Sequence, residues 1–181
     1  LTKGYLPFPS SEWRTDRFTM KITAFATGEP GQPVLYLGCR IVNTAKVWQS
    51  LRLFTALRPF QVTPTWQNWR SFGGISPIRE LCFSDGAVWI NGNKPVIPLT
   101  VPTGFGAAAF AAGGVTKHLI MGEVPPQMEV LDEFGYASGA LRFDLNLAPG
   151  SSEEVYLAVP FGTLESHGQE PVAPAVRRNP P

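Results

Sequence analysis

Residues typical of catalytic and cofactor sites are scarce in this 181-residue sequence. It contains two cysteines and two histidines, and it has no Gly-x-Ser-x-Gly segment that would indicate a hydrolase nucleophile elbow. Gly104 and Gly106 are not followed by Gly-Lys-Ser/Thr, so a phosphate loop is not indicated and no cofactor is expected. No apolar run approaches the ~18 residues of a membrane-spanning helix, so we expect no membrane partner.

Charge is also sparse, since only 16% of the residues are Asp, Glu, Lys or Arg. Fifteen basic residues face fourteen acidic ones, which gives a net charge of +1. The basic residues are scattered, and only Arg177 and Arg178 are adjacent. Because duplex nucleic acid is held by a basic stripe or patch, we expect no nucleic-acid partner.

The two cysteines, Cys39 and Cys82, lie in apolar stretches, far in the sequence from His118 and His167. Free cysteine is among the most buried residue types, so we expect two buried thiols. A disulfide between them stays open as an alternative if the compartment is oxidising. A metal site needs more ligands than these residues offer, and none is expected.

Helical periodicity is missing over any useful length, whereas period-2 alternation typical of half-buried strands recurs at 51–57 and 140–147. Asp85-Gly86 and Asn91-Gly92 tolerate the positive φ angles of tight hairpin turns, so we expect a three-stranded meander over 78–97. We expect a loop with one helical turn at 107–112 and a short strand at 116–121. Together these patterns predict an all-β fold, an antiparallel β-sandwich with few or no helices.

The apolar pattern divides the chain into three parts. Residues 1–17 are expected to form an irregular lead-in, 18–162 the β-sandwich domain, and 163–181 a Pro-rich tail or linker. The chain begins at Leu1 and its first methionine is Met20, which suggests a fragment of a longer protein.

Hydrolysis of a glycosidic bond needs two carboxylates flanking that bond. The candidates are Glu129, Asp132, Glu133 and Asp144. We favour a solvated acidic loop at 129–133, so the chain is expected to have no catalytic residues. A small β-sandwich hydrolase is the less favoured alternative.

The segment 58–70 is the stronger candidate for a binding role. Sugar rings stack on tryptophan, and polar neighbours bind their hydroxyl groups. Both kinds of side chain occur here, so the segment predicts a carbohydrate-binding or domain-contact site; its residues are Arg58, Trp66, Gln67, Asn68, Trp69 and Arg70. The alternative in which both tryptophans fill the core stays open.

Several short motifs in residues 18–162 resemble a known domain family. They are Asn43, Leu51-Arg52-Leu53, Arg58-Pro59-Phe60-Gln61-Val62-Thr63-Pro64, Gly73-Gly74-Ile75-Ser76-Pro77-Ile78, Asp85-Gly86, Asn91-Gly92, Ala137-Ser138-Gly139-Ala140-Leu141 and Leu157-Ala158-Val159-Pro160-Phe161-Gly162. This pattern resembles the β-sandwich ("supersandwich") domain that precedes an (α/α)6-barrel in bacterial glycoside-hydrolase-like proteins, some of them described as coagulation factor 5/8 type or discoidin-containing.

The resemblance implies a supersandwich-like accessory domain whose parent protein acts on carbohydrate. The catalytic acids of such proteins lie in the helical barrel, so the family supplies no catalytic residue for this chain. We therefore expect a non-catalytic domain that packs against an adjacent catalytic domain of the same polypeptide, with an autonomous carbohydrate-binding module as the alternative. The sequence leaves its location open, with a periplasmic or secreted parent as one option.

Overall fold

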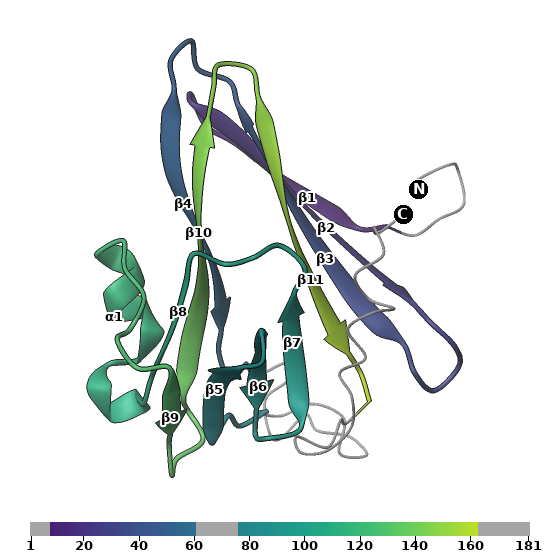
Figure 1. The fold of residues 1–181 in the computed structure, drawn as a ribbon, viewed down its shortest axis with the longest axis vertical. Coiled ribbons are helices and arrows are strands. Elements are labelled where there is room, and N and C mark those ends of the chain that lie inside the picture. The colour runs from purple at the N-terminus through teal and green to yellow at the C-terminus, as the bar shows by residue number, and fades with distance from the viewer. Residues whose placement is uncertain (1–7, 61–75, 163–181) are drawn as a thin grey trace, which may run out of the picture. The chain divides into compact units, whose positions relative to one another are not determined.

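The computed structural model of the chain describes residues 8–60 and 76–162 (Figure 1). The fold is all-β and sandwich-like, with mainly antiparallel strands and one short α-helix, as the sequence predicts. The chain forms two compact units. Unit 1 comprises Leu1–Leu53, Asn93–Pro102 and Phe143–Pro181, and unit 2 comprises Phe54–Gly92 and Thr103–Arg142.

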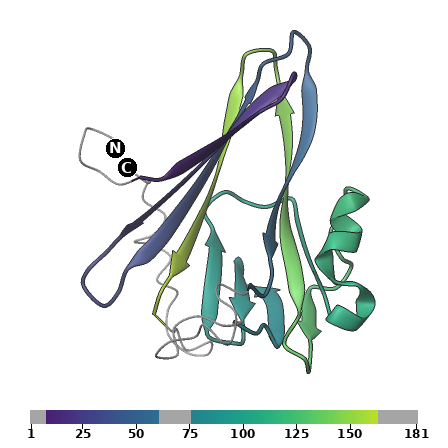
Figure 2. The same cartoon turned by 180° about the vertical axis from the view of Figure 1, so that it is seen from behind.

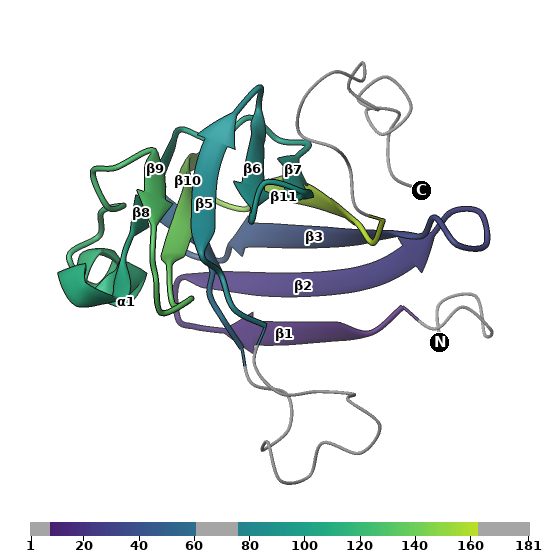
Figure 3. The ribbon, with the colours of Figure 1, turned by 90° about the horizontal axis from the view of Figure 1, so that it is seen from below.

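Antiparallel strands form the sheet of unit 1, in the order β1-β2-β3-β11-β7. Their bounds are β1 Ser10–Arg14, β2 Phe18–Thr27, β3 Val34–Asn43, β7 Lys94–Pro98 and β11 Ser152–Pro160. Seen from below, β1, β2 and β3 run side by side (Figure 3). Residues opposite each other across antiparallel strands share a face, so Ile22, Cys39 and Val155 lie on one face and Thr23, Gly38 and Tyr156 on the other.

The strand β1 corrects the expected irregular lead-in. All five of its residues pair with β2, from Ser10 opposite Thr23 to Arg14 opposite Thr19. Every residue of β1 is exposed, so no apolar alternation marks this strand in the sequence. Backbone pairing to the long neighbouring strand, rather than burial, holds this segment in place.

Asn43 fixes the corner between β3 and β4, which spans Gln49–Leu57. The Asn43 side chain is fully buried. Its amide donates to the carbonyls of Val47 and Leu147, both at 2.9 Å, and its oxygen accepts the N–H of Ala45 at 2.9 Å. A buried amide with all these partners stabilises one geometry of the turn, since leaving any of the groups unpaired would be costly.

The described part of unit 2 contains shorter strands, one α-helix and one 3-10 turn. Its elements are β5 Glu80–Ser84, β6 Ala87–Ile90, β8 Gly104–Ala108, the 3-10 turn Phe110–Ala112, α1 Gly114–Ile120 and β9 Glu129–Leu131. Strand β10, Ser138–Leu147, pairs through Ser138–Arg142 with β8, while β5 pairs with both β6 and β9. The buried core includes Leu81, Val88, Phe105 and Leu141.

The expected meander and its turn between β5 and β6 are confirmed. Asp85 and Gly86 have φ angles of 51° and 76°, and Asn91 and Gly92 have 52° and 70°. The Asn91 side chain also accepts the N–H of Arg79 at 2.8 Å, so the second turn is tied to the start of β5. Positive φ at consecutive positions is what Asn-Gly and Asp-Gly tolerate.

Around residues 104–121 one expectation is confirmed in part and another is wrong. Residues 107–112, expected as a loop with one helical turn, contain the 3-10 turn Phe110–Ala112. Residues 104–108 form β8, and 116–121, expected as a strand, lie largely in α1, beside β8 in Figures 1 and 2. Gly113 and Gly114 have φ angles of 92° and 64°, so they turn the chain sharply into the helix. The helix buries only Val115, which explains why no helical periodicity marks it. No helix in the described ranges has the length and apolar character needed to cross a membrane.

Candidate functional site

Most of the predicted binding segment, namely Trp66, Gln67, Asn68, Trp69 and Arg70, lies outside the described residues. Arg58 directly follows β4 and its side chain is exposed. The prediction of a carbohydrate or domain contact at this segment therefore stays a prediction. Another group of residues in unit 2 has the properties that the sequence suggested for segment 58–70.

Three of the four candidate acids fit the expectation of solvated side chains, and one does not. Glu129 and Glu133 are exposed, and Asp144 is exposed and forms an ion pair with Arg52, 3.7 Å from its Nε. Asp132, in contrast, is only 4% exposed. The expected acidic loop thus has a buried carboxylate at its centre.

The Asp132 carboxylate holds three backbone N–H groups from two segments of the chain. Its Oδ2 accepts the N–H of Phe110 at 2.6 Å, and its Oδ1 accepts the N–H groups of Phe134 at 2.9 Å and Tyr136 at 3.3 Å. The Asp132 carbonyl also accepts the N–H of Gly135 at 3.1 Å, which closes the turn. Hydrogen bonds to an ionised acceptor are the stronger kind, so this arrangement fixes the local backbone.

The pKa of Asp132 reflects two opposing effects. Burial raises the pKa, because a charged carboxylate loses hydration. The N–H donors of Phe110, Tyr136, Phe134 and Gly135 lower it, and their combined effect leaves the pKa below its ordinary value. Asp132 is therefore ionised at neutral pH and is occupied by backbone donors, so we assign it a structural role.

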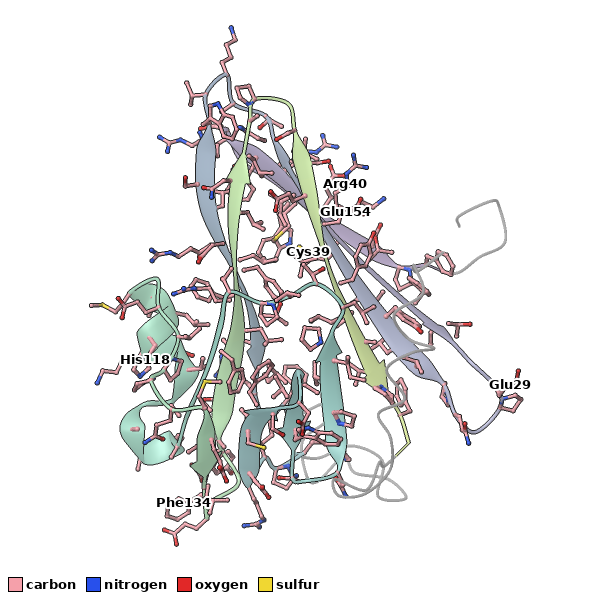
Figure 4. The ribbon with its side chains drawn as sticks, viewed as in Figure 1. Glu29, Cys39, Arg40, His118, Phe134 and Glu154 are labelled. Carbon is pink, nitrogen blue, oxygen red and sulfur yellow. The ribbon has the colours of Figure 1, made fainter. Side chains whose placement is uncertain are left out.

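The residues that Asp132 holds carry exposed aromatic rings. Phe110 and Phe134 are each 62% exposed and Tyr136 is 41% exposed. The rings of Phe110 and Tyr136 lie 5.6 Å apart, at an angle of 51°. We call Phe110, Phe134 and Tyr136 the aromatic patch; Figure 4 shows Phe134 at the surface of the molecule.

Polar and apolar groups border the aromatic patch. The Arg79 guanidinium donates to the Glu133 carbonyl at 2.6 Å, so a cation lies beside the turn. Leu131, next to Asp132 in the chain, is 71% exposed. The patch and its surroundings can therefore make both apolar contacts and hydrogen bonds with a partner.

Part of this arrangement carries a signal in the sequence. An aspartate at the first position of a turn commonly accepts N–H groups of that turn. Asp132-Glu133-Phe134-Gly135 has this pattern, with the glycine three residues after the aspartate. The bond to Phe110, 22 residues away, has no such signal, because it depends on how the chain folds between them.

The two cysteines are free thiols in the structure, and both are half-buried rather than fully buried. Burial raises the pKa of Cys39 to about 11. Burial also raises the pKa of Cys82, and the charges of Glu80 and Glu129 raise it further. Among the described residues, no group of three or more potential metal ligands lies together.

No family model matches the chain, and no curated protein matches it. What this arrangement can do is therefore inferred from the residues themselves.

Proposed function

We propose that this chain is a non-catalytic β-sandwich accessory domain of a larger carbohydrate-active protein, and that it packs against the catalytic domain through the aromatic patch. The observation that carries this proposal is the set of three exposed rings whose backbone is held by one buried carboxylate. The carbohydrate-active setting comes from the resemblance to domains that precede an (α/α)6-barrel.

Exposed aromatic side chains of this size are typical of contact surfaces. Aromatic residues are enriched among those that contribute most to binding energy, and grouped exposed rings commonly mark an interface. Phe110, Phe134 and Tyr136 come from two separate segments of unit 2, so their grouping is a product of the fold. A patch of this kind supports a partner with an apolar surface.

The anchoring by Asp132 adds a second argument. Ordering loops and side chains on binding costs free energy, and a surface that is already ordered avoids part of that cost. Each residue of the aromatic patch donates its backbone N–H to the Asp132 carboxylate. This supports a surface whose backbone is already ordered before a partner binds.

Glycan binding at the same patch is the second candidate function. The Tyr136 ring beside Phe110, with the Arg79 guanidinium near the turn, supplies both ring faces and a hydrogen-bond donor. Sugars use this combination, since their rings stack on aromatic faces while their hydroxyls bind polar groups.

Phe134→Ala tests the docking function, with Phe161→Ala as the matched control. Phe161 is the same residue type with a similar exposure of 65%, and it lies in unit 1. In the full-length polypeptide, we expect Phe134→Ala to lower the melting temperature or to split one calorimetric transition into two. The isolated chain should melt as before. Equal effects of the two substitutions in the full-length protein would contradict docking at this patch.

Calorimetric titration of the isolated chain with neutral oligosaccharides tests the second candidate. Binding that is weakened by Tyr136→Ala and unchanged by Phe161→Ala would favour glycan binding at the aromatic patch. Absence of any heat of binding that depends on Tyr136 would exclude it.

A further inference from the structure

A second surface lies in unit 1, on the outward face of β2, β3 and β11. The register places its side chains in three rows across the strands, and opposite residues share a face. The rows are Phe25, Tyr36 and Ala158; Thr23, Gly38 and Tyr156; and Lys21, Arg40 and Glu154. We call this the Gly38 surface; one end of it is aromatic and the other is charged.

The middle row is hollow because Gly38 has no side chain. A Cβ added there would lie 2.9 Å from Cε1 of Tyr156, so the tyrosine ring extends across the glycine. A pocket of about 240 Å³ opens at this point, and its lining includes Thr23, Phe25 and Tyr156. A volume of this size is comparable to a single sugar ring or a similar small group.

The aromatic end of the pocket is formed by rings packed on one another. Phe25 lies 5.3 Å from Tyr36 in a stacked arrangement and 4.9 Å from Phe8. All three side chains are half-buried. Together these rings present an apolar wall to a ligand in the pocket.

At the charged end, each oxygen of the Glu154 carboxylate has one partner. Tyr156 donates its hydroxyl to Glu154 Oε2, and Arg40 Nε lies 3.7 Å from Glu154 Oε1. Arg40 also donates to the Ser152 hydroxyl at 3.3 Å. The hydrogen bond to Glu154 raises the pKa of Tyr156, burial and the Glu154 charge raise it further, and Arg40 opposes them, so the phenol stays protonated.

Lys21 is the second cation of the row that contains Arg40 and Glu154. Glu12, opposite Lys21 in the register, forms an ion pair with Arg14 at 2.5 Å. None of the ion pairs within the described part of the chain includes Lys21. Counting Arg14, Glu12, Lys21, Arg40 and Glu154 together, three positive charges face two negative ones, so this end of the surface attracts an anion.

We infer that the Gly38 surface binds a uronic acid residue of an acidic glycan, with the sugar ring against Phe25 and Tyr156 and the carboxylate at Lys21. The flat face of the ring matches the aromatic wall, and its hydroxyls can reach the Thr23 hydroxyl and the Glu154 carboxylate. Lys21 supplies the charge-assisted contact that a neutral sugar could not use.

This inference rests on the carbohydrate-active part of the proposed function, but not on docking at the aromatic patch. The two surfaces involve different residues in different units, so each can fail alone. Failure of docking would appear in the melting of the full-length protein, whereas failure here would appear in ligand titrations of the isolated chain.

The test is a titration of the chain with oligogalacturonate, with a neutral oligogalactan of equal length, and with benzoate. We expect oligogalacturonate to bind, benzoate to bind more weakly or not at all, and the neutral glycan to bind at least about tenfold more weakly. Lys21→Gln should reduce the affinity for oligogalacturonate about tenfold and should weaken its dependence on salt. Lys46→Gln is the matched control, since Lys46 is exposed in unit 1 and lies outside this surface.

Gly38→Ala provides a second variant that displaces the Tyr156 ring from its place in the pocket without changing charge, and melting of each variant checks that it is folded. Loss of oligogalacturonate binding in folded Gly38→Ala supports the assignment. Equal binding of the acidic and neutral glycans, equal loss in Lys21→Gln and Lys46→Gln, or no binding of oligogalacturonate would each overturn it. Benzoate binding as tightly as oligogalacturonate would assign the pocket to aromatic carboxylates instead and would equally overturn the proposal.

Discussion

The aromatic patch and the Gly38 surface place functional side chains in different ways. In unit 2, one buried carboxylate holds the backbone of three exposed rings that come from two segments of the chain. In unit 1, the register of three long strands aligns the side chains, and a missing side chain at Gly38 makes the hollow. The first surface depends on a single group, whereas the second is distributed over many backbone hydrogen bonds.

This difference predicts unequal tolerance to substitution. A change at one buried residue of unit 2 should disturb the whole aromatic patch. A change at one position of the Gly38 surface should alter the pocket while leaving the sheet intact, because the pairing of β2, β3 and β11 does not depend on any one side chain.

Gly106→Ala should have the largest effect. A Cβ at Gly106 would lie 1.8 Å from the Pro125 carbonyl oxygen, and a backbone atom cannot rotate away as a side chain can. We expect a loss of about 3 kcal/mol or more in the free energy of unfolding, measured by urea denaturation. Gly162→Ala is the control, since nothing lies within 4 Å of its added Cβ. Similar stabilities of the two variants would refute the close approach.

Asp132→Ala should have the next largest effect. It leaves the N–H groups of Phe110, Phe134 and Tyr136 without their acceptor, and we expect a loss of about 2–3 kcal/mol. Glu133→Ala, which removes the exposed neighbouring carboxylate, should change the stability little. Faster hydrogen exchange at residues 110, 134 and 136 in Asp132→Ala would locate the loss. Unchanged exchange there would show that Asp132 does not anchor the patch.

Acid should remove the same stabilisation in the unaltered chain. The pKa of Asp132 is lowered in the folded state, so its contribution is fully present above the ordinary value of 3.8 and is lost as pH falls through the folded pKa. We therefore expect the stability difference between the unaltered chain and Asp132→Ala to be constant near neutral pH and to shrink below pH 3.8. Denaturant melts of both proteins across this range measure it. A difference that grew on acidification would contradict the sign of the shift.

Gly38→Ala should have the smallest effect on stability. The nearest atoms to its added Cβ belong to the Tyr156 ring, a half-exposed side chain that can move outward. We expect a change below about 1 kcal/mol, together with altered tyrosine fluorescence or ring resonances of Tyr156. A loss as large as that of Gly106→Ala would mean that the two units do not differ in tolerance.

The fold was predictable wherever the signal is local. Asp85-Gly86 and Asn91-Gly92 take the positive φ angles that their residue types tolerate, and the alternation over 140–147 matches β10. Elements without a buried face gave no such signal. Strand β1 is exposed throughout and α1 buries only Val115, so both were missed.

The two candidate surfaces were less predictable, because each depends on long-range arrangement. The turn at Asp132-Glu133-Phe134-Gly135 has a recognisable sequence, but its bond to Phe110 does not. The Gly38 surface depends on the register of β11 against β3. This register places Tyr156 opposite Gly38, although the two are more than a hundred residues apart in the sequence. Sequence alone shows the residue types, and only the pairing shows which of them meet.

Strand β1 has a consequence for keeping this protein in solution. Within the described ranges β1 pairs only with β2, so it forms an edge of the sheet whose unpaired N–H and C=O groups could recruit another chain. Glu12 and Arg14 place charges along that edge, a common protection against intermolecular pairing. Strand β2 behind it is twice as long, at ten residues, and carries one charged residue, Lys21. Removing β1 would expose β2 as a longer and more apolar edge strand, so β1 protects the sheet from pairing with other chains and from aggregation.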